Sequence, residues 1–235
     1  MTGDREARPV LFAGPTLHRA RAIRPLDLDA FDLQPPIQRG DLPRLLARRR
    51  PPGCLILVDG LFHNVLSVGH VEIRDALAAG YTVWGMSSMG AIRAREMGPL
   101  GMRGFGRVYA SYCGPGDFRD DEVALVHEPT PPYAEHSEPL VHLRAGLADL
   151  VARGLLTPAD SDGTVEELRR MWYCERTLAL TCRLLTDRAP ELAPVLPAWV
   201  EDFDRFRVKA LDLLDFVEGE VWRSAPAEAA DGPTR

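Results

Sequence analysis

The chain has 235 residues, of which 46% are hydrophobic and 26% charged, and its formal net charge is −6. This length is enough for one large domain or two small ones with a real core, and the acidic balance argues against a general nucleic-acid binder. No signal peptide and no apolar run of membrane-spanning length are recognisable, so a cytoplasmic protein without a membrane partner is expected.

The N-terminal part begins with short elements bounded by proline and glycine. Residues 1–8 are expected to form a disordered leader, followed by a first strand within 8–17 that ends at Gly14-Pro15. Residues 26–39 are expected to be extended or looped. Residues 41–50 read as a short helix with Asp41 as its N-cap.

A strand–helix–strand–helix pattern follows. Residues 54–60 are a continuous apolar run, typical of a strand buried on both faces. Residues 67–80 read as a helix capped by Ser67, and residues 81–86 as a second buried strand. A helix then starts near Met89. This alternation predicts an α/β fold with a parallel sheet.

Three turns follow the predicted strands. They are Gly14-Pro15-Thr16, Asp59-Gly60 and Ser87-Ser88. Because ligands of parallel sheets bind beyond the carboxyl ends of the strands, these turns should share one edge and form the candidate site.

The Ser87-Ser88 turn has two interpretations. A serine between a strand and a helix has its hydroxyl beside unpaired amides, which suits an acyl-transfer nucleophile with an oxyanion site. Serine is also a preferred helix N-cap, and geometry alone favours capping.

The middle of the chain carries no recognisable cofactor or metal motif. Residues 98–106 are glycine-rich but lack the context of a dinucleotide-binding loop, so they read as an irregular connector before a short helix at 107–113. Asp120, Asp121 and Glu122 are adjacent in sequence and therefore do not face one another as a metal set would. They are expected to form a solvated turn or an acidic patch that binds a partner. The four cysteines show no zinc spacing and are expected to be small buried residues.

From Ser137 onward the apolar residues have helical spacing. A first helix is predicted over 137–154, with Leu140, Leu143, Leu147 and Leu150 on one face. Another helix is predicted to start with Thr157 as its cap, and a helix is predicted over 165–187. The last predicted helix carries an apolar stripe of Trp199, Phe203, Phe206, Ala210, Leu213 and Val217. Residues 9–223 are expected to form a single domain, with an α/β part over 9–135 and an all-helical part over 136–223 packed on it. Residues 224–235 are expected to be a disordered tail.

Several stretches, taken in order, resemble the TfuA-like family across residues 9–150. They are Phe12-Ala-Gly-Pro-Thr-Leu17, Ile56-Leu-Val-Asp-Gly-Leu-Phe62, Ser67-Val-Gly-His-Val-Glu-Ile73, Gly85-Met-Ser-Ser-Met-Gly-Ala-Ile-Arg-Ala-Arg-Glu96, Gly101-Met-Arg-Gly-Phe-Gly106 and Asp120-Asp-Glu-Val-Ala124. The resemblance implies a partner of a YcaO enzyme in peptide backbone thioamidation. It also implies a Ser-Lys hydrolase that releases sulfur from a thiocarboxylated ThiS-like carrier protein, and help for the YcaO enzyme in engaging its precursor peptide. No cofactor and no metal are expected. A non-catalytic adaptor is the alternative.

On this resemblance Ser88 is the candidate nucleophile, because Gly90 follows it by two residues. Ser87 would cap the helix or donate to an oxyanion, together with amides near Met89 and Gly90. Gly14, Thr16 and Gly60 are further candidates for substrate binding.

The candidate base departs from the family pattern, because the family often has a lysine where this chain has Val71. The chain has a single lysine, Lys209. A lysine base must be kept neutral by burial or a nearby charge. The alternative is a lysine that extends along the helix to pair with Asp212.

Three more residues are candidates for the functional site, and each of them also has an ordinary structural interpretation. His70 is a substitute base or a hydrogen-bonded histidine on a buried helix face. Asp59 binds a ligand or shapes the Asp-Gly turn. Arg93 binds the carrier's thiocarboxylate or forms a surface salt bridge.

Overall fold

The computed structural model describes residues 8–49, 51–61, 65–114 and 119–224. The leader predicted for residues 1–8 and the tail predicted for residues 224–235 therefore lie almost wholly outside the described residues, as do Arg50, Phe62 and Phe118.

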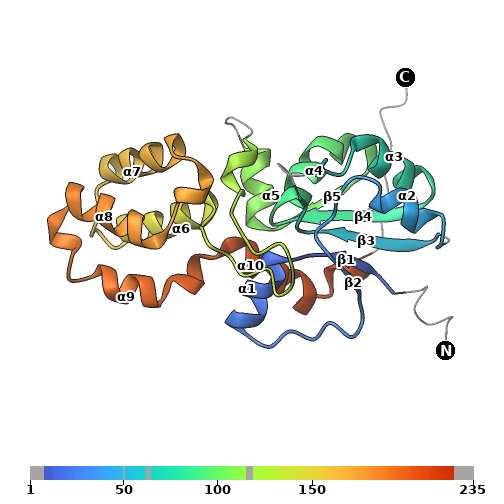
Figure 1. Ribbon diagram of the computed structural model, residues 1–235, viewed down its shortest axis with the longest axis horizontal. Helices are drawn as coiled ribbons and strands as arrows, with labels where there is room; N and C mark the ends of the chain where they lie inside the picture. The colour runs from blue at the N-terminus through green and yellow to red at the C-terminus, as the bar shows by residue number, and fades with distance from the viewer. Residues whose placement is uncertain (1–7, 50, 62–64, 115–118, 225–235) are drawn as a thin grey trace, which may run out of the picture.

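A five-stranded parallel sheet forms the core of the first half of the chain (Figure 1). Its strands are β1 (Val10–Phe12), β2 (Asp32–Gln34), β3 (Gly53–Leu57), β4 (Tyr81–Met86) and β5 (Arg103–Phe105), in the spatial order β2-β1-β3-β4-β5. The α/β prediction is confirmed. The strand order reverses between β1 and β3, and a crevice opens beyond the carboxyl ends of the strands at such a switch point.

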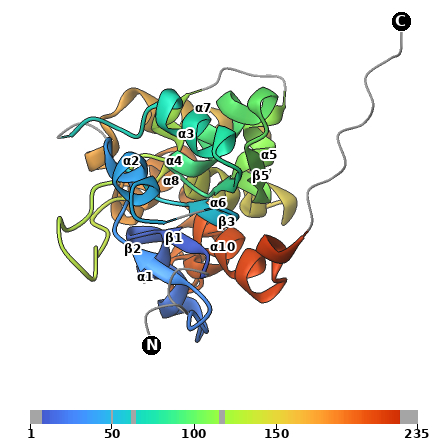
Figure 2. The same ribbon diagram turned by 90° about the vertical axis from the view of Figure 1, so that its right-hand side faces the viewer.

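Helices cover both faces of the central part of the sheet, which is why β1, β3 and β4 are mostly apolar on both sides. Along β3, Leu55 and Leu57 face one helical layer, whereas Ile56 and the following Val58 face the other. The first layer contains α2 (Asp41–Leu46), α3 (His70–Ala78) and α4 (Met89–Met97), and the second contains α1 (Pro15–Ile23) and α10 (Val208–Glu218) (Figure 2). Helix α5 (Gly106–Cys113) packs against α4 and α10.

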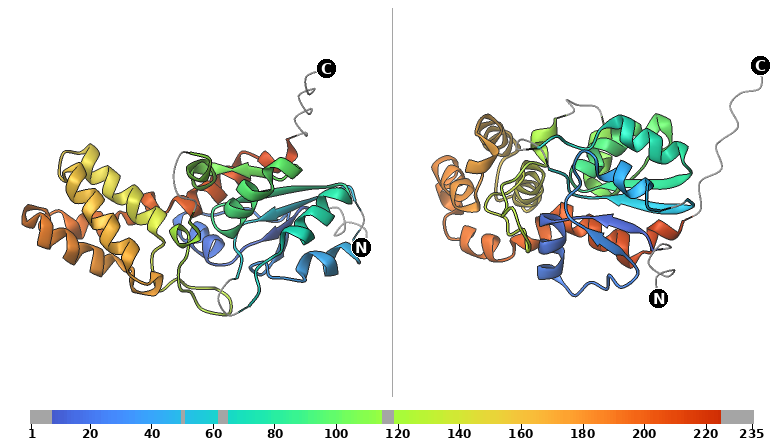
Figure 3. Two further views of the ribbon diagram at one scale, coloured as in Figure 1. Left: turned by 90° about the horizontal axis from the view of Figure 1, so that it is seen from above. Right: turned by 45° about the vertical axis from the view of Figure 1, so that its right-hand side comes forward.

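The remaining helices form a lobe at one end of the molecule (Figure 3). They are α6 (Leu140–Ala152), α7 (Pro158–Arg170), α8 (Leu178–Arg188) and α9 (Leu196–Glu201). The four leucines predicted on one face of α6 are each 0% exposed, which confirms their helical spacing. Thr157 caps α7 as predicted, since its hydroxyl oxygen accepts from the amide of Asp160 at 3.1 Å. Within the described residues, none of the helices combines the length and apolar character that crossing a bilayer requires.

The single helix predicted over 165–187 is wrong. Helix α7 ends at Arg170, a 3-10 turn covers Tyr173–Glu175, and α8 starts at Leu178. The break is stabilised by Arg176, whose 1%-exposed guanidinium donates to the carbonyl oxygens of Leu168, Arg169 and Met171. Leu168 and Arg169 lie in the last turn of α7 and Met171 is its C-cap, a region of a helix where carbonyl groups lack the usual intrahelical donors.

The last predicted helix is also divided. Helix α9 ends at Glu201, a 3-10 turn covers Phe203–Phe206, and α10 starts at Val208. All the apolar residues of the predicted stripe are buried, but they belong to two cores. Trp199, Phe203 and Phe206 pack inside the lobe, whereas Ala210, Leu213 and Val217 pack on the sheet.

Several predicted helix and strand boundaries differ from those in the structure, because the elements concerned are short. Strand β5 lies within the segment predicted as an irregular connector, and α1 follows the Gly14-Pro15 turn without having been predicted. Helix α3 starts at His70 with Gly69 as N-cap, so Ser67 does not cap it, and α2 has Gly40 rather than Asp41 as N-cap. The cysteines are not fully buried either: Cys54 and Cys182 are half-buried, and Cys113 and Cys174 are exposed.

Candidate active site

Asp59 joins the carboxyl ends of β1 and β3. Its Oδ2 accepts from the amides of Gly14 at 2.8 Å and Thr16 at 3.0 Å, and its Oδ1 accepts from the Thr16 hydroxyl at 2.7 Å. These amides belong to the first turn of α1, where a helix has unpaired donors and a positive dipole end. Asp59 is 2% exposed, so this carboxylate does more than shape its own turn. Two of the three predicted turns thus meet at the switch point.

The two serines of the third turn have different surroundings. Ser87 is 0% exposed and has a positive φ of 64°, and its hydroxyl donates to the carbonyl oxygen of Lys209 at 2.9 Å. Ser88 occupies the N-cap position of α4 without a side-chain capping bond. The capping interpretation is therefore wrong for both hydroxyls. Within the described part of the chain, the Ser88 hydroxyl makes no hydrogen bond, and Ser88 lines a cavity.

Two glycines hold the serine turn close to the sheet. A Cβ on Gly90 would lie 1.7 Å from the carbonyl oxygen of Leu57, and a Cβ on Gly85 would lie 2.1 Å from that of Gly90. Only glycine permits this approach of α4 to the strands. The Gly90 amide donates to the carbonyl oxygen of Val58 at 3.1 Å, so it cannot bind an oxyanion without losing that bond.

Two other amides near Ser88 can donate to an oxyanion without losing a hydrogen bond. The Gly60 amide donates no hydrogen bond to any described residue, and Gly60 lines the cavity. The amide of Met89 is at the first position of α4, where no intrahelical acceptor exists. The Ser88 amide, in contrast, donates to the carbonyl oxygen of Met86 at 2.7 Å.

The cavity has a volume of about 290 Å³ and lies beyond the ends of β1, β3 and β4. Its polar residues are Asp59, Ser88, Lys209, His127 and Tyr173; the others, from the three strand ends and residues 123–129, are Pro15, Gly60, Leu61, Val65, Val123, Leu125, Val126 and Pro129. Tyr173 lies in the break between α7 and α8, so a residue of the helical lobe also lines this cavity.

Lys209 is buried beside the serine. It is 2% exposed and lines the cavity with Ser88, and its Nζ donates to the carbonyl oxygen of Val123 at 3.1 Å. Burial lowers the pKa of Lys209, while the charges of Asp59 and nearby glutamates oppose this shift. Asp212 instead accepts from the amide of Val108 and from Arg107, so the alternative interpretation, in which Lys209 pairs with Asp212, is wrong.

A buried polar network behind Lys209 was not identified from the sequence. His142 Nε2 accepts from the Lys209 amide at 3.4 Å, and Nδ1 lies 2.9 Å from a carboxylate oxygen of Glu138, which also pairs with Arg207. Burial lowers the pKa of His142 to about 4 although Glu138 opposes it. Burial alone would raise the pKa of Glu138, but His142 and Arg207 lower it to about 2. The i, i+4 spacing of Glu138 and His142 is the sequence feature from which their pairing could have been predicted.

His70 and Arg93 lie apart from the cavity. His70 is exposed rather than on a buried face, and its Nε2 is 2.8 Å from Glu96. Arg93 pairs with Glu96 and donates to the carbonyl oxygen of Val68 at 3.0 Å. Arg93 therefore forms the salt bridge given as its structural alternative.

The acidic triplet holds the two halves of the chain together. Asp121 pairs with buried Arg176, and Glu122 pairs with Arg144 and Arg169. These two carboxylates are therefore not a solvated turn. Within the described residues, no three side chains of metal-ligating type are grouped as a metal site would need.

Comparison with known proteins supports the resemblance noted above. The family model described as TfuA-like protein matches residues 59–177, just over half of the chain. The matched segment contains Asp59, Ser88 and Val123, and Lys209 follows it. None of the curated proteins matches the chain.

Proposed function

Because the chain belongs to the TfuA-like family, we propose that it works with a YcaO enzyme in backbone thioamidation of a precursor peptide and hydrolyses the thiocarboxylate of a ThiS-like carrier protein. The family association supports the thioamidation context. Because the YcaO enzyme uses ATP, we propose that the reaction takes place in the cytoplasm.

The observation that carries the hydrolase proposal is the presence of two side chains, Ser88 and Lys209, in the lining of one cavity. Ser88 offers a hydroxyl without a hydrogen bond to a described residue, and Lys209 offers a buried amine with a lowered pKa. Serine becomes nucleophilic when a neighbouring base accepts its proton, and burial provides such a base by favouring the neutral amine.

In the proposed reaction, Ser88 Oγ attacks the thiocarboxylate carbon and its proton passes to Lys209. The amides of Gly60 and Met89 stabilise the oxyanion. The C–S bond then breaks, the departing sulfide takes up the proton from Lys209 and is released as hydrosulfide, and an acyl ester remains on Ser88. Water attacks this ester with Lys209 again accepting a proton, which releases the carrier carboxylate and restores the serine hydroxyl.

Substitution of the serine tests this mechanism. Ser88→Ala should lower hydrolysis of a thiocarboxylated carrier by at least about a hundredfold, as loss of a nucleophile does. The rate is followed as sulfide release and, by mass spectrometry, as conversion of thiocarboxylate to carboxylate. Ser111→Ala is the matched control, because the Ser111 hydroxyl donates to Val108 on α5, outside the cavity. Wild-type rates for Ser88→Ala would exclude Ser88 as the nucleophile.

A non-catalytic adaptor is the second candidate. It is favoured by the direction of Lys209 Nζ, which donates to Val123 rather than to Ser88, and by exposed Val71 where the family often has lysine. An adaptor would raise the affinity of the YcaO enzyme for its peptide in both wild type and Ser88→Ala, and neither protein would release sulfide.

A further inference from the structure

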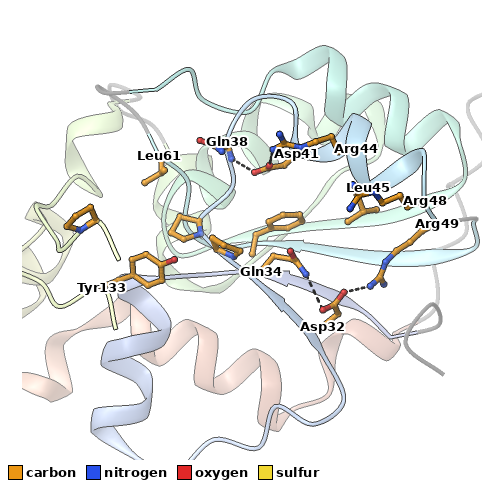
Figure 4. Close-up of a pocket in the computed structure, with 14 residues that line it drawn as sticks. Asp32, Gln34, Gln38, Asp41, Arg44, Leu45, Arg48, Arg49, Leu61 and Tyr133 are labelled. Atoms are coloured by element: carbon orange, nitrogen blue, oxygen red, sulfur yellow. Dashed lines mark hydrogen bonds and ion pairs between the residues drawn. The ribbon is translucent and has the colours of Figure 1, made fainter. Parts of the chain in front are cut away.

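A second cavity, of about 630 Å³, lies between β2 and α2 (Figure 4). We call it the edge groove. It is lined by Phe12, Asp32, Gln34, Pro35, Pro36, Gln38, Asp41, Arg44, Leu45, Arg48, Arg49, Leu61, Pro129 and Tyr133. Figure 4 shows side chains of β2 and of the α2 segment on opposite sides of this groove.

The groove is open because β2 is an edge strand beside a short helix. Asp32 pairs in register with Val10, and Gln34 pairs with Phe12. These side chains therefore project on the same face of the sheet as Phe12, where α2 has only six residues. An edge strand also leaves one row of backbone donors and acceptors without a neighbouring strand.

The groove carries a local positive charge in an acidic protein. Its lining includes three arginines and two aspartates; Asp41 pairs with Arg44, and Asp32 pairs with Arg49. Arg48 is exposed and forms no ion pair with a described residue. The groove thus presents an available guanidinium, which favours carboxylate ligands.

The edge groove adjoins the Ser88 cavity. Leu61 and Pro129 line both of them. A chain whose reacting carbonyl lies at Ser88 would therefore reach the groove by passing these two side chains. A small molecule confined to the 290 Å³ cavity would have no use for this extension.

We infer that the edge groove is a docking subsite for an acidic, extended polypeptide segment of the substrate, on the amino-terminal side of the reacting carbonyl. Gln34 and Gln38 offer amide groups for the peptide backbone, and Arg48 offers a charge for an acidic side chain. The inference depends on the proposed function in one respect: the end of the segment that reaches Ser88 is its carboxyl-terminal end.

Binding of labelled peptides to the full chain tests the groove itself. The probes are two fluorescein-labelled decapeptides with a free carboxylate, one containing four glutamates and the other four glutamines at the same positions. Fluorescence anisotropy at low salt should show the glutamate peptide binding at least about fivefold more tightly, with the difference decreasing as salt is added.

Charge reversal locates the effect. Arg48→Glu should remove the preference for the glutamate peptide, whereas Arg183→Glu should keep it, because Arg183 is likewise exposed without an ion pair but lies on α8. Equal binding of the two peptides, no binding of either, or an unchanged preference in Arg48→Glu would overturn the inference.

Kinetics separate this inference from the proposed function. With a thiocarboxylated carrier as substrate, Arg48→Glu should raise KM about tenfold and leave kcat unchanged, as loss of uniform binding does. If Ser88→Ala hydrolyses normally while the peptide result holds, the hydrolase mechanism fails and the groove stands. If Arg48→Glu changes neither KM nor peptide preference, the groove fails and the hydrolase mechanism stands.

Discussion

Asp59 is the residue on which the geometry of the strand ends depends most directly. Its carboxylate accepts three hydrogen bonds from Gly14 and Thr16, and none of these bonds is local in sequence. Two substitutions separate the roles of shape and charge: Asp59→Ala removes both acceptor oxygens and with them all three hydrogen bonds, and Asp59→Asn keeps the shape but removes the charge.

The magnitudes follow from counting the groups that lose a partner. In Asp59→Ala the buried amides of Gly14 and Thr16 have no acceptor, and each such group costs roughly 1–3 kcal/mol. Together with the lost hydroxyl bond, the free energy of unfolding should fall by about 3–6 kcal/mol. In Asp59→Asn the amide oxygen can accept from both backbone groups, and the Thr16 hydroxyl can rotate to accept from the amide nitrogen. Only the charge assistance is lost, so about 1–2 kcal/mol is expected.

Urea unfolding at pH 7, followed by circular dichroism, measures both values. Thr16→Val is the control, because it removes the single hydroxyl bond and should cost about 1 kcal/mol. The reasoning would be refuted if Asp59→Ala were within about 1 kcal/mol of wild type, or if Asp59→Asn were the less stable of the two variants.

The same pair of variants reports on Lys209. Asp59 is the first of the charges that favour the protonated amine of Lys209. In Asp59→Asn the pKa of Lys209 should fall further, so the pH at which hydrolysis reaches half its maximum should move to lower pH. A shift to higher pH would contradict the assignment of Lys209 as the base.

Three further predictions concern the surroundings of the site. Lys209→Met should keep or raise the free energy of unfolding in urea, because burying an ammonium group is costly, while sulfide release is lost. Gly90→Ala should lower the melting temperature strongly, by overpacking that costs about 3 kcal/mol, whereas Gly98→Ala, with open space at its Cβ position, should change it little. His142 has a pKa of about 4 in the folded protein, and ordinary histidine has one of about 6.5. The unfolded chain therefore binds more protons between these values, so the free energy of unfolding should fall as the pH is lowered through this window, and His142→Gln should show a smaller slope.

The sequence predicted the parts of the site that depend on local pattern. The strand over 81–86, the Ser-Ser turn and the helix from Met89 were predicted because a buried apolar run, a turn and a helical pattern follow one another there. The meeting of the Asp59 and Gly14-Thr16 turns followed from the parallel topology alone.

Other features depend on tertiary contacts, which a local sequence pattern does not reveal. Strands β2 and β5 have three residues each and, unlike β1 of the same length, contain no buried apolar run that would predict a strand. The apolar spacing from Trp199 to Val217 continued across a break between two helices, so it indicated burial but not which core. Spacing along the helix offered Asp212 as an alternative partner of Lys209, but such spacing does not say which way a side chain points when another surface covers it.

The hydrogen bond from Ser87 to the carbonyl oxygen of Lys209 joins residues 122 positions apart. During synthesis the strands and the serine turn leave the ribosome long before α10 does, and the wall of the cavity that carries Lys209 is missing until then. Until then the nascent protein has Ser88 without Lys209, which is the base of the proposed mechanism. Docking of α10 completes the cavity wall, so a chain that ends before residue 209 should lack the cavity that the proposed reaction needs, even where its sheet has formed.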